Sequence, residues 1–381
     1  MNLGEDAYFS KGTARGILLG GKGQKKIHIS TSASLSQIRD ACKKLGVQCR
    51  INNKINAMTL ELMTKNKYII YPFIKTTLKN NYAVRKYSKD YRDAQKSCGF
   101  TVGSFMVSDE VKKSYKSIPH SFKDLNSKLI RLNGDPHSKI TENRMFLLEA
   151  GVLQAELGND WQIEHKTYEA IQERSLEVAI VSAEAIRKTM TYLIEETDRP
   201  SLAFRFYKNT GILQEIMPEL LRGVGLAQSN KSSTLDLFNH IMYALDSVDR
   251  SQTNYVALRW ACIFHDIAKP YTKSFDPKGN VHFYGHDKIG AIFATRWMEK
   301  YKFDKALTAK VNTICRHHLF DASPRLETAG IKRLIKRIGK DHIFDLLDMR
   351  IADRYGTGRP DISMKKIEVL RRKVDNILKS S

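Results

Sequence analysis

The chain has 381 residues, of which 42% are hydrophobic, and its 63 Lys and Arg against 41 Asp and Glu give a formal net charge of +22. This length and apolar content predict a globular protein with two or three domains. No apolar run approaches the roughly 20 residues that cross a bilayer, and the N-terminal segment is unlike a signal peptide, so we expect a cytoplasmic protein. The five Cys have no Cys-x-x-Cys spacing, which argues against a zinc finger or a disulfide framework.

The positive charge indicates a polyanionic partner, because an excess of Lys and Arg attracts phosphates and steers their approach. Two runs, 75–89 and 331–337, interleave cations with Tyr or aliphatic residues, a pattern in which Lys and Arg meet phosphates while Tyr stacks on unpaired bases. RNA fits this pattern best; a generally basic, solvated surface is the alternative. The candidate RNA-binding residues are Lys75, Lys79, Arg85, Lys86, Arg333 and Lys336.

The periodicity of apolar residues changes along the chain. Residues 1–108 alternate short β-branched runs with helical patterns such as 34–45, which predicts a small α/β head. From 109 to 228 the periodicity is helical and predicts an all-α body. The remainder, 229–381, is helical apart from one Gly/Pro/Asp loop. The expected fold class is therefore α+β, with a C-terminal domain that is all-α.

The C-terminal domain contains His and Asp residues in a pattern that favours a metal site. His265 and Asp266 directly follow the apolar helical run 256–264, His240 shares the apolar face of an earlier helical run, and Asp353 follows a later one. A single buried His is usually a hydrogen-bonded core residue. His and Asp that converge from separate helices, however, hold divalent ions in helical bundles, and such ions activate water for attack on phosphorus. The pattern therefore predicts a metal-dependent phosphohydrolase.

The order of these residues resembles the HD phosphohydrolase superfamily. The resemblance implies that one divalent ion is held by His240, His265, Asp266 and Asp353. It further implies that His286 and His317, with His318 as the alternative to His317, add ligands for a second ion that Asp266 bridges. Lys269 would bind phosphate as a point charge, so that the expected catalytic residues are Asp266, Lys269, His286 and His317. The metal is left open among Mn, Ni, Mg and Fe.

The chain as a whole resembles the bacterial tRNA nucleotidyltransferases, or CCA-adding enzymes, and their poly(A) polymerase relatives, some of which carry an HD domain. The resemblance rests on the segments 12–20, 26–33, 100–104 and 207–220. In that family the second segment carries paired carboxylates that hold Mg²⁺, whereas here these positions are Lys26 and His28. Further motif positions are replaced in the segments 68–73, 98–99, 142–146 and 185–189. The head is therefore expected to keep the fold and to have lost nucleotide addition.

The two resemblances together imply a phosphohydrolase or phosphodiesterase that acts on RNA ends, such as a 2′,3′-cyclic or terminal phosphate of tRNA. A nucleotide-like substrate and RNA are the expected partners. A small-molecule nucleotidase or cyclic-nucleotide phosphodiesterase would use the same metal site, and a non-catalytic tRNA-binding protein would need only the basic surface. The replaced carboxylates argue most strongly against an active CCA-adding enzyme.

Overall fold

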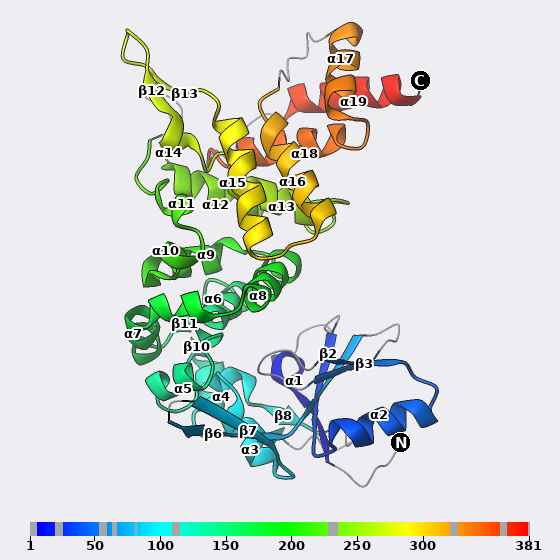
Figure 1. The fold of residues 1–381 in the computed structure, drawn as a ribbon, viewed down its shortest axis with the longest axis vertical. Helices are drawn as coiled ribbons and strands as arrows, with labels where there is room; N and C mark the ends of the chain where they lie inside the picture. The colour runs from blue at the N-terminus through cyan, green and yellow to red at the C-terminus, as the bar shows by residue number, and fades with distance from the viewer. Residues whose placement is uncertain are drawn as a thin grey trace. The chain divides into compact units, whose positions relative to one another are not determined.

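The computed structural model describes residues 6–19, 26–52, 59–62, 67–80, 82–108, 115–227, 235–320, 327–358 and 364–379. The chain divides into two compact units, Met1–Glu177 and Val178–Ser381 (Figure 1). The expected body, 109–228, is thus shared between both units, and its predicted end lies outside the described residues. The division into head, body and HD domain at 108 and 228 stays a prediction.

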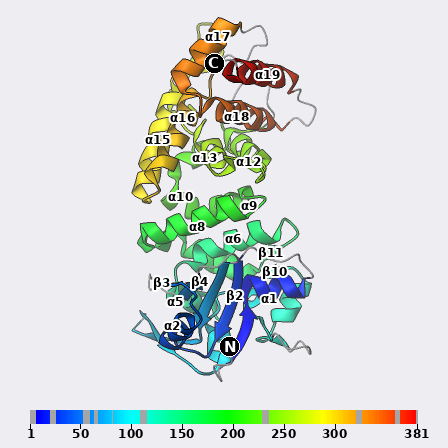
Figure 2. The same ribbon diagram turned by 90° about the vertical axis from the view of Figure 1, so that its right-hand side faces the viewer.

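The first unit is built on a seven-stranded sheet with the order β3-β4-β5-β2-β1-β8-β9 (Figure 2). Its strands are β1 (Ala7–Ser10), β2 (Lys26–Thr31), β3 (Cys49–Asn52), β4 (Thr59–Leu62), β5 (Lys67–Pro72), β8 (Met106–Val107) and β9 (Tyr115–Lys116). Strands β2 and β5 are parallel, and the other neighbours in the sheet are antiparallel.

Helix α2 (Leu35–Lys44) covers one face of this sheet. Ser34 is the N-cap of the helix and forms a capping box with Gln37. The Ser34 side chain accepts from the backbone N–H of Gln37, and the Gln37 side chain accepts from the backbone N–H of Ser34. The buried side chains of Ile38 and Cys42 pack with Leu60 of β4 in one hydrophobic cluster. Because side chains alternate along a strand, the positions next to Leu60 belong to the opposite face of the sheet.

The remaining elements of the first unit are mostly helices. They are α1 (Lys11–Leu18), α3 (Tyr91–Ser97), α4 (Ser121–Asn126), α5 (Pro136–Glu142), α6 (Phe146–Leu157) and α7 (His165–Glu173), with the 3₁₀ turn η1 (Thr101–Gly103). A separate antiparallel hairpin is formed by β6 (Ile74–Lys79) and β7 (Tyr82–Tyr87). Strands β10 (Leu129–Ile130) and β11 (Gln162–Ile163) form a short parallel pair, and η2 (Ser175–Ile180) crosses from the first unit into the second.

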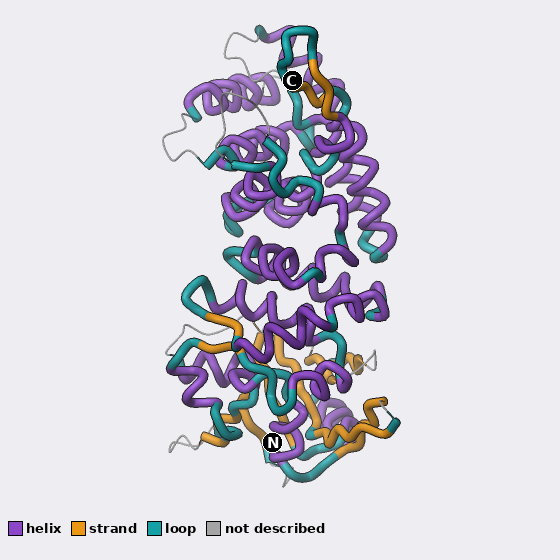
Figure 3. The backbone as a smooth tube through the Cα atoms, turned by 90° about the vertical axis from the view of Figure 1, so that its left-hand side faces the viewer, coloured by secondary structure: helices purple, strands orange, loops and turns teal. Residues whose placement is uncertain are grey.

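In its described residues, the second unit is helical apart from one small hairpin, β12 (Lys273–Phe275) and β13 (Val281–Phe283) (Figure 3). Its helices before this hairpin are α8 (Ala183–Glu196), α9 (Ser201–Thr210), α10 (Ile212–Ile216), α11 (Pro218–Leu221), α12 (Leu237–Ser247), α13 (Tyr255–Phe264) and α14 (Lys269–Thr272). Those after it are α15 (His286–Lys300), α16 (Lys305–His317), α17 (Thr328–Ile338), α18 (Ile343–Tyr355) and α19 (Lys365–Lys379). The predicted α+β class is confirmed.

Helix α13 runs through the core of the second unit. Every residue from Ala257 to Phe264 is buried, and the rings of Trp260 and Phe264 pack against Trp297 of α15 at centroid distances of 5.2 and 5.7 Å. Because α13 is buried on all its faces, His265 and Asp266, which follow it, are also buried in the core. Among the described residues, no helix has both the length and the apolarity needed to cross a membrane.

A buried arginine ties α13 to the ends of two neighbouring helices. Arg259 is 1% exposed, and its guanidinium donates to the carbonyl oxygens of Ile194 at 2.8 Å, Thr197 at 2.7 Å and Val248 at 3.1 Å. These carbonyls belong to the last turns of α8 and α12 or directly follow them, where helical hydrogen bonds run out and a cation is favourable. Burial lowers the pKa of Arg259, but a guanidinium stays charged at any ordinary pH.

Replacing this arginine should destabilise the second unit. Arg259→Leu leaves several buried carbonyls without a donor, and we expect the free energy of unfolding to fall by about 3 kcal/mol. Urea denaturation followed by tryptophan fluorescence measures this, because Trp260 and Trp297 both lie in the second unit. Arg296→Leu, at an exposed position of α15, is the control and should change stability by less than about 0.5 kcal/mol. Equal stability of the two variants would contradict this role for Arg259.

Candidate functional site

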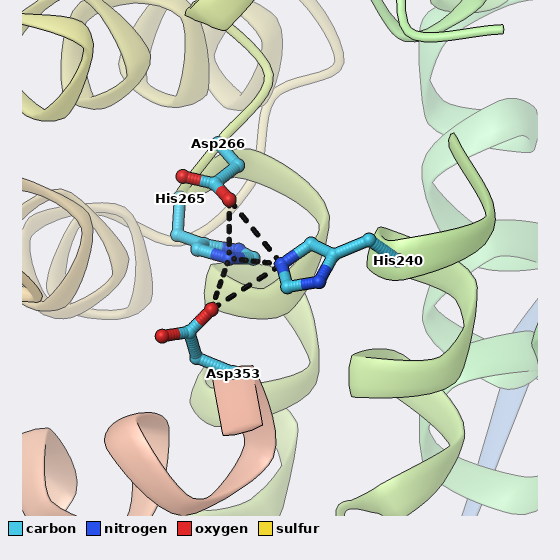
Figure 4. Close-up of side chains that lie close together, drawn as sticks. All are labelled: His240, His265, Asp266 and Asp353. Carbon is cyan, nitrogen blue, oxygen red and sulfur yellow. Dashed lines mark hydrogen bonds and ion pairs between the residues drawn. The ribbon is translucent and has the colours of Figure 1, made fainter. Parts of the chain in front are cut away.

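Four side chains of the second unit converge on one point in its core (Figure 4). The Nε2 atom of His240 lies 3.2 Å from Asp266 Oδ2 and 3.3 Å from Asp353 Oδ1. The Nε2 atom of His265 lies 3.2 Å from the same oxygen of Asp266 and 3.6 Å from Asp353 Oδ1. The two Nε2 atoms are 3.3 Å apart. This arrangement is a cage of nitrogen and oxygen ligands of the size that a metal ion needs.

Three helices, α12, α13 and α18, place the members of this cage. Asp236 caps α12 by accepting from the Asn239 amide, and His240 then lies on the buried face that Leu237 and Ile241 share. His265 is the C-cap of α13. Asp353 comes from the last turn of α18, where Arg350 Nη1 lies 3.0 Å from its second oxygen. The site therefore depends on how the consecutive helices α12 and α13 pack against α18, which lies much later in the chain.

A second group shares Asp266 with the first. Asp266 Oδ1 lies 3.1 Å from His286 Nε2 and 3.6 Å from His318 Nε2, and the two Nε2 atoms are 3.3 Å apart. Since Oδ2 of Asp266 faces the first group and Oδ1 faces the second, this carboxylate has the geometry of a bridge between two ion positions.

The second nitrogen of several of these rings fixes the tautomer. Nδ1 of His265 lies 2.8 Å from the carbonyl oxygen of Cys262, and Nδ1 of His286 and of His318 lies 2.6 Å from the carbonyl of the residue three positions earlier. A carbonyl can only accept, so Nδ1 carries the proton, and the lone pair of the neutral ring is on Nε2. Metal-ligating histidines are held in this way.

The electrostatics of the site favour a cation. Burial by itself lowers the pKa of His265, but the carboxylates of Asp266 and Asp353 outweigh it and raise the pKa to about 10. Burial by itself raises the pKa of Asp266, yet His265 and the Lys269 ammonium hold that pKa well below its ordinary value. Burial lowers the pKa of His318. The carboxylates therefore stay charged, and a metal ion can take the place of the protons that the imidazoles hold.

Lys269 contacts the site through Asp266, and its Nζ lies 2.6 Å from Asp266 Oδ2. The lysine begins α14, which follows the His-Asp pair directly, and its side chain is largely buried. A cation at this place partly neutralises the buried carboxylate. A role for Lys269 in binding phosphate stays a prediction.

His318 is a member of the second group, and His317 is not. From the sequence we expect His317, with His318 as the alternative. Consecutive residues of a helix point about 100° apart, so only one of these two neighbours at the end of α16 can face Asp266. His318 is buried, whereas the pKa of His317 is lowered by burial and by the nearby cations Arg337 and Arg316. The buried face of α16, which includes Ile314 and Cys315, was the signal that would have favoured His318.

Two glycines that the sequence did not single out allow the helices to come close enough. A Cβ atom at Gly290 of α15 would lie 2.8 Å from the carbonyl oxygen of Phe264, and one at Gly356 would lie 2.7 Å from the ring of His240. Such distances are far below van der Waals contact. These positions thus require glycine because of neighbouring backbone or ring atoms, and no periodicity of the sequence reveals them.

The first unit has different chemistry at the strand that resembles a metal-binding motif. The Nδ1 atom of His28 on β2 lies 2.8 Å from the hydroxyl of Tyr71 on β5. The Nζ atom of Lys11 lies 3.7 Å from the centre of the Tyr71 ring. Position 26 is a strand residue paired with Lys67. Among the described residues of the first unit, no His, Cys, Asp and Glu side chains form a group like those around Asp266. Lys11 of α1 is the cation next to Tyr71 and His28.

The candidate RNA-binding residues lie on two elements. Lys75, Lys79 and Lys86 are exposed on the β6–β7 hairpin. Arg85 is partly buried and donates to the Glu142 carbonyl oxygen at 2.9 Å, so its guanidinium anchors the hairpin to the end of α5. Two further candidates, Arg333 and Lys336, are exposed on α17.

Comparisons with known proteins agree with the fold. Residues 234–357 match the HD domain family. The chain is 32% identical over 155 residues to the A-adding tRNA nucleotidyltransferase of Deinococcus radiodurans, covering 40% of this chain and 35% of that protein. It is 28% identical over 186 residues to the CC-adding tRNA nucleotidyltransferase of Thermus thermophilus, covering 47% of this chain and 41% of that protein. The chain thus spans less than half the length of these curated relatives.

A solved structure extends the similarity over both units. The crystal structure of the Bacillus stearothermophilus CCA-adding enzyme in complex with CTP aligns with 98% of this chain and 79% of its own, with a TM-score of 0.67 and 16% identity. At this identity the similarity concerns the fold. The first unit thus has the fold of that enzyme, although Lys26 and His28 stand where CCA-adding enzymes carry paired carboxylates.

These findings correct the expected function. The hypothesis of an RNA-end phosphohydrolase that has lost nucleotide addition is wrong. The curated relatives are nucleotidyltransferases, and the similarity to them points to a transferase and not to a hydrolase. The replaced residues Lys26 and His28, which predicted the loss of nucleotide addition, stand within a chain that is otherwise similar to nucleotidyltransferases. The resemblance on which it rested is confirmed. In sequence and in fold the chain is similar to tRNA nucleotidyltransferases, and it carries an HD domain at residues 234–357.

Proposed function

We propose that this protein is a tRNA nucleotidyltransferase, which binds a tRNA and a nucleotide and adds the nucleotide to the end of the tRNA. The observation that carries the proposal is the alignment of 98% of the chain, both units included, with a CCA-adding enzyme that was solved with CTP. One curated relative adds A and another adds CC, so the experiment has to offer both ATP and CTP.

The charge of the chain supports a tRNA partner. Each phosphate that Lys or Arg neutralises releases condensed counterions, which makes a surplus of 22 positive charges a strong source of affinity for a polynucleotide. Exposed cations occur on the β6–β7 hairpin of the first unit and on α17 of the second. Both units therefore offer surfaces that a polyanion could contact.

The head would handle the nucleotide with cations of its own. Lys11 begins α1 with φ of +51°, a backbone conformation that costs energy for a residue with a side chain and that occurs often at functional positions. Although burial by itself lowers its pKa, the nearby Tyr71, Cys98 and Glu149 raise it, so Lys11 stays charged. In this proposal Lys11 stabilises the phosphates, and Mg²⁺ enters with the nucleotide, whose phosphates supply much of its coordination.

The HD domain would hold a divalent metal ion separately from the head chemistry. The donor set around Asp266 fits this, because imidazole nitrogens and charged carboxylate oxygens converge there, and a metal ion can replace the protons between them. One ion would be held by His240, His265, Asp266 and Asp353, and a second by Asp266, His286 and His318. Mn²⁺, Fe²⁺, Ni²⁺ and Mg²⁺ are the candidates.

Nucleotide addition is tested with radiolabelled ATP and CTP on tRNA transcripts that end before the final A or before both C residues. We expect label to enter at least one transcript. Lys11→Met should reduce kcat/KM by about tenfold or more, because a charged hydrogen bond to phosphate is lost. Lys44→Met, at an exposed position of α2, is the matched control and should keep wild-type rates.

The same assay locates the reaction within the chain. Asp266→Asn should keep nucleotide addition, since the proposal assigns transfer to the head. Absence of incorporation by a folded wild-type protein that binds tRNA would contradict the transferase and leave only a binding role. Loss of incorporation in Asp266→Asn alone would show that the reaction depends on the HD centre.

The metal site is tested by metal analysis of protein purified without chelators. Asp266→Asn keeps the shape of the side chain but removes its charge, and we expect the bound metal to fall about tenfold or more, since ligand and near-ligand changes cost at least this much affinity. His318→Ala should lose metal as well, whereas the neighbouring His317→Ala should retain it. Equal metal content in these variants and the wild type would contradict the assignment, provided that circular dichroism shows each to be folded.

A further inference from the structure

The β6–β7 hairpin has two chemically different faces. It pairs Ile74 with Tyr87 at one end and Lys79 with Tyr82 at the other, and Asn80, at φ of +49°, begins the turn. Successive pairs point to opposite faces of the ribbon. Three alternate pairs therefore make an inner face: Ile74 with Tyr87, Thr76 with Arg85, and Leu78 with Ala83. The other three pairs make an outer face: Lys75 with Lys86, Thr77 with Val84, and Lys79 with Tyr82.

The inner face anchors the hairpin to the first unit. The Ser97 hydroxyl at the end of α3 lies 2.8 Å from the Ile74 carbonyl oxygen and 3.1 Å from the Thr76 hydroxyl. Arg85 donates to the Glu142 carbonyl oxygen at the end of α5. These contacts hold the ribbon at both edges and fix which face is turned outward.

The outer face carries an unbalanced positive charge. Lys75, Lys79 and Lys86 are exposed, and Tyr82 beside Lys79 is 77% exposed. The segment 74–87 contains no Asp or Glu, and within the described part of the chain no ion pair involves these lysines. Thr77 and Val84 lie between the charged pairs, so the face is a short strip of cations with an aromatic ring at its tip.

This arrangement works against the stability of the hairpin itself. Lys75 and Lys86 are directly opposite each other, where the Cβ atoms of a cross-strand pair lie about 5 Å apart and like charges repel. An exposed Tyr ring also loses the burial that stabilises most aromatic side chains. A ligand that supplies negative charge along the strip and a flat ring for Tyr82 would remove both costs.

We propose that the outer face of the β6–β7 hairpin binds single-stranded RNA, with Lys75, Lys79 and Lys86 on phosphates and Tyr82 stacked on an unpaired base. A paired base offers no open face to a protruding Tyr, whereas single strands are bound by cations combined with aromatic platforms. This inference rests on the proposed function, because the proposed tRNA substrate supplies the single-stranded RNA as its end. Arg85, bound to α5, serves to position the strip.

The charge component is tested with the full chain and labelled tRNA in a salt series. In single-stranded contacts, log K falls with log salt by about 0.7 per neutralised phosphate. The triple variant Lys75→Gln, Lys79→Gln, Lys86→Gln should therefore lower this slope by about 2. A control triple removes as many exposed charges elsewhere in the first unit, at Lys43→Gln, Lys44→Gln and Lys123→Gln, and should keep the wild-type slope.

The stacking component is tested with short RNA probes. Tyr82→Leu should weaken binding of a single-stranded 12-nucleotide RNA by about fivefold or more, since loss of one base stack costs at least this much. Tyr82→Phe keeps the ring and should bind as the wild type does. Binding of a blunt RNA duplex should be unaffected by either change. An equal loss on duplex and single strand would overturn the single-strand assignment.

The outcomes separate this inference from the proposed function. If the wild type binds tRNA and adds nucleotides but the hairpin triple behaves as the control triple does, only the hairpin inference is wrong. If the wild type fails to bind tRNA, both are wrong. If the hairpin triple instead loses binding to vesicles of phosphatidylserine and phosphatidylcholine while its tRNA binding is unchanged, the strip contacts a lipid surface and the RNA assignment is overturned.

Discussion

The buried charge of Asp266 is the constraint on which the second unit depends. This carboxylate is 2% exposed, and burying an unpaired carboxylate costs several kcal/mol or more. The structure offsets this cost by directing Lys269 and the four imidazoles of His240, His265, His286 and His318 at its two oxygens. These side chains come from α12, α13, α14, α15 and the end of α16. The geometry of the site therefore depends directly on how these helices pack.

The two units differ in the charge of the side chains that they gather. The second unit gathers carboxylates and imidazoles, a donor set that suits a metal ion once it replaces the imidazole protons. The first unit instead has Lys11 beside Tyr71 and the lysine strip on β6–β7, which are the cations that the proposal assigns to phosphates. Nucleotidyl transfer by such a head would rely on the ion that the nucleotide carries, and this explains how Lys26 and His28 could stand at positions where a carboxylate pair is usual in the family.

Much of the architecture could be predicted from the sequence, because it follows from periodicity and composition. The helical run 256–264 and the His-Asp pair after it lie where the pattern places them. The choice between His317 and His318 could not be made, since it depends on how α16 is rotated against α13. The close approaches at Gly290 and Gly356 depend on backbone atoms of distant segments. The function could not be predicted from Lys26 and His28 alone, because replaced residues show what a motif has lost and not what the remaining side chains can do.

The central claim for the second unit is that a divalent ion compensates the buried charge of Asp266. Anomalous X-ray diffraction from crystals of the protein purified without chelators, with data collected at the absorption edges of Mn, Fe and Ni, tests it most directly. The account predicts a peak about 2.0–2.2 Å from Nε2 of His240 and of His265, as expected for a bound transition metal, and also in contact with Asp266. Well-ordered side chains at these positions with no anomalous peak, in crystals soaked with Mn²⁺ as well, would contradict it.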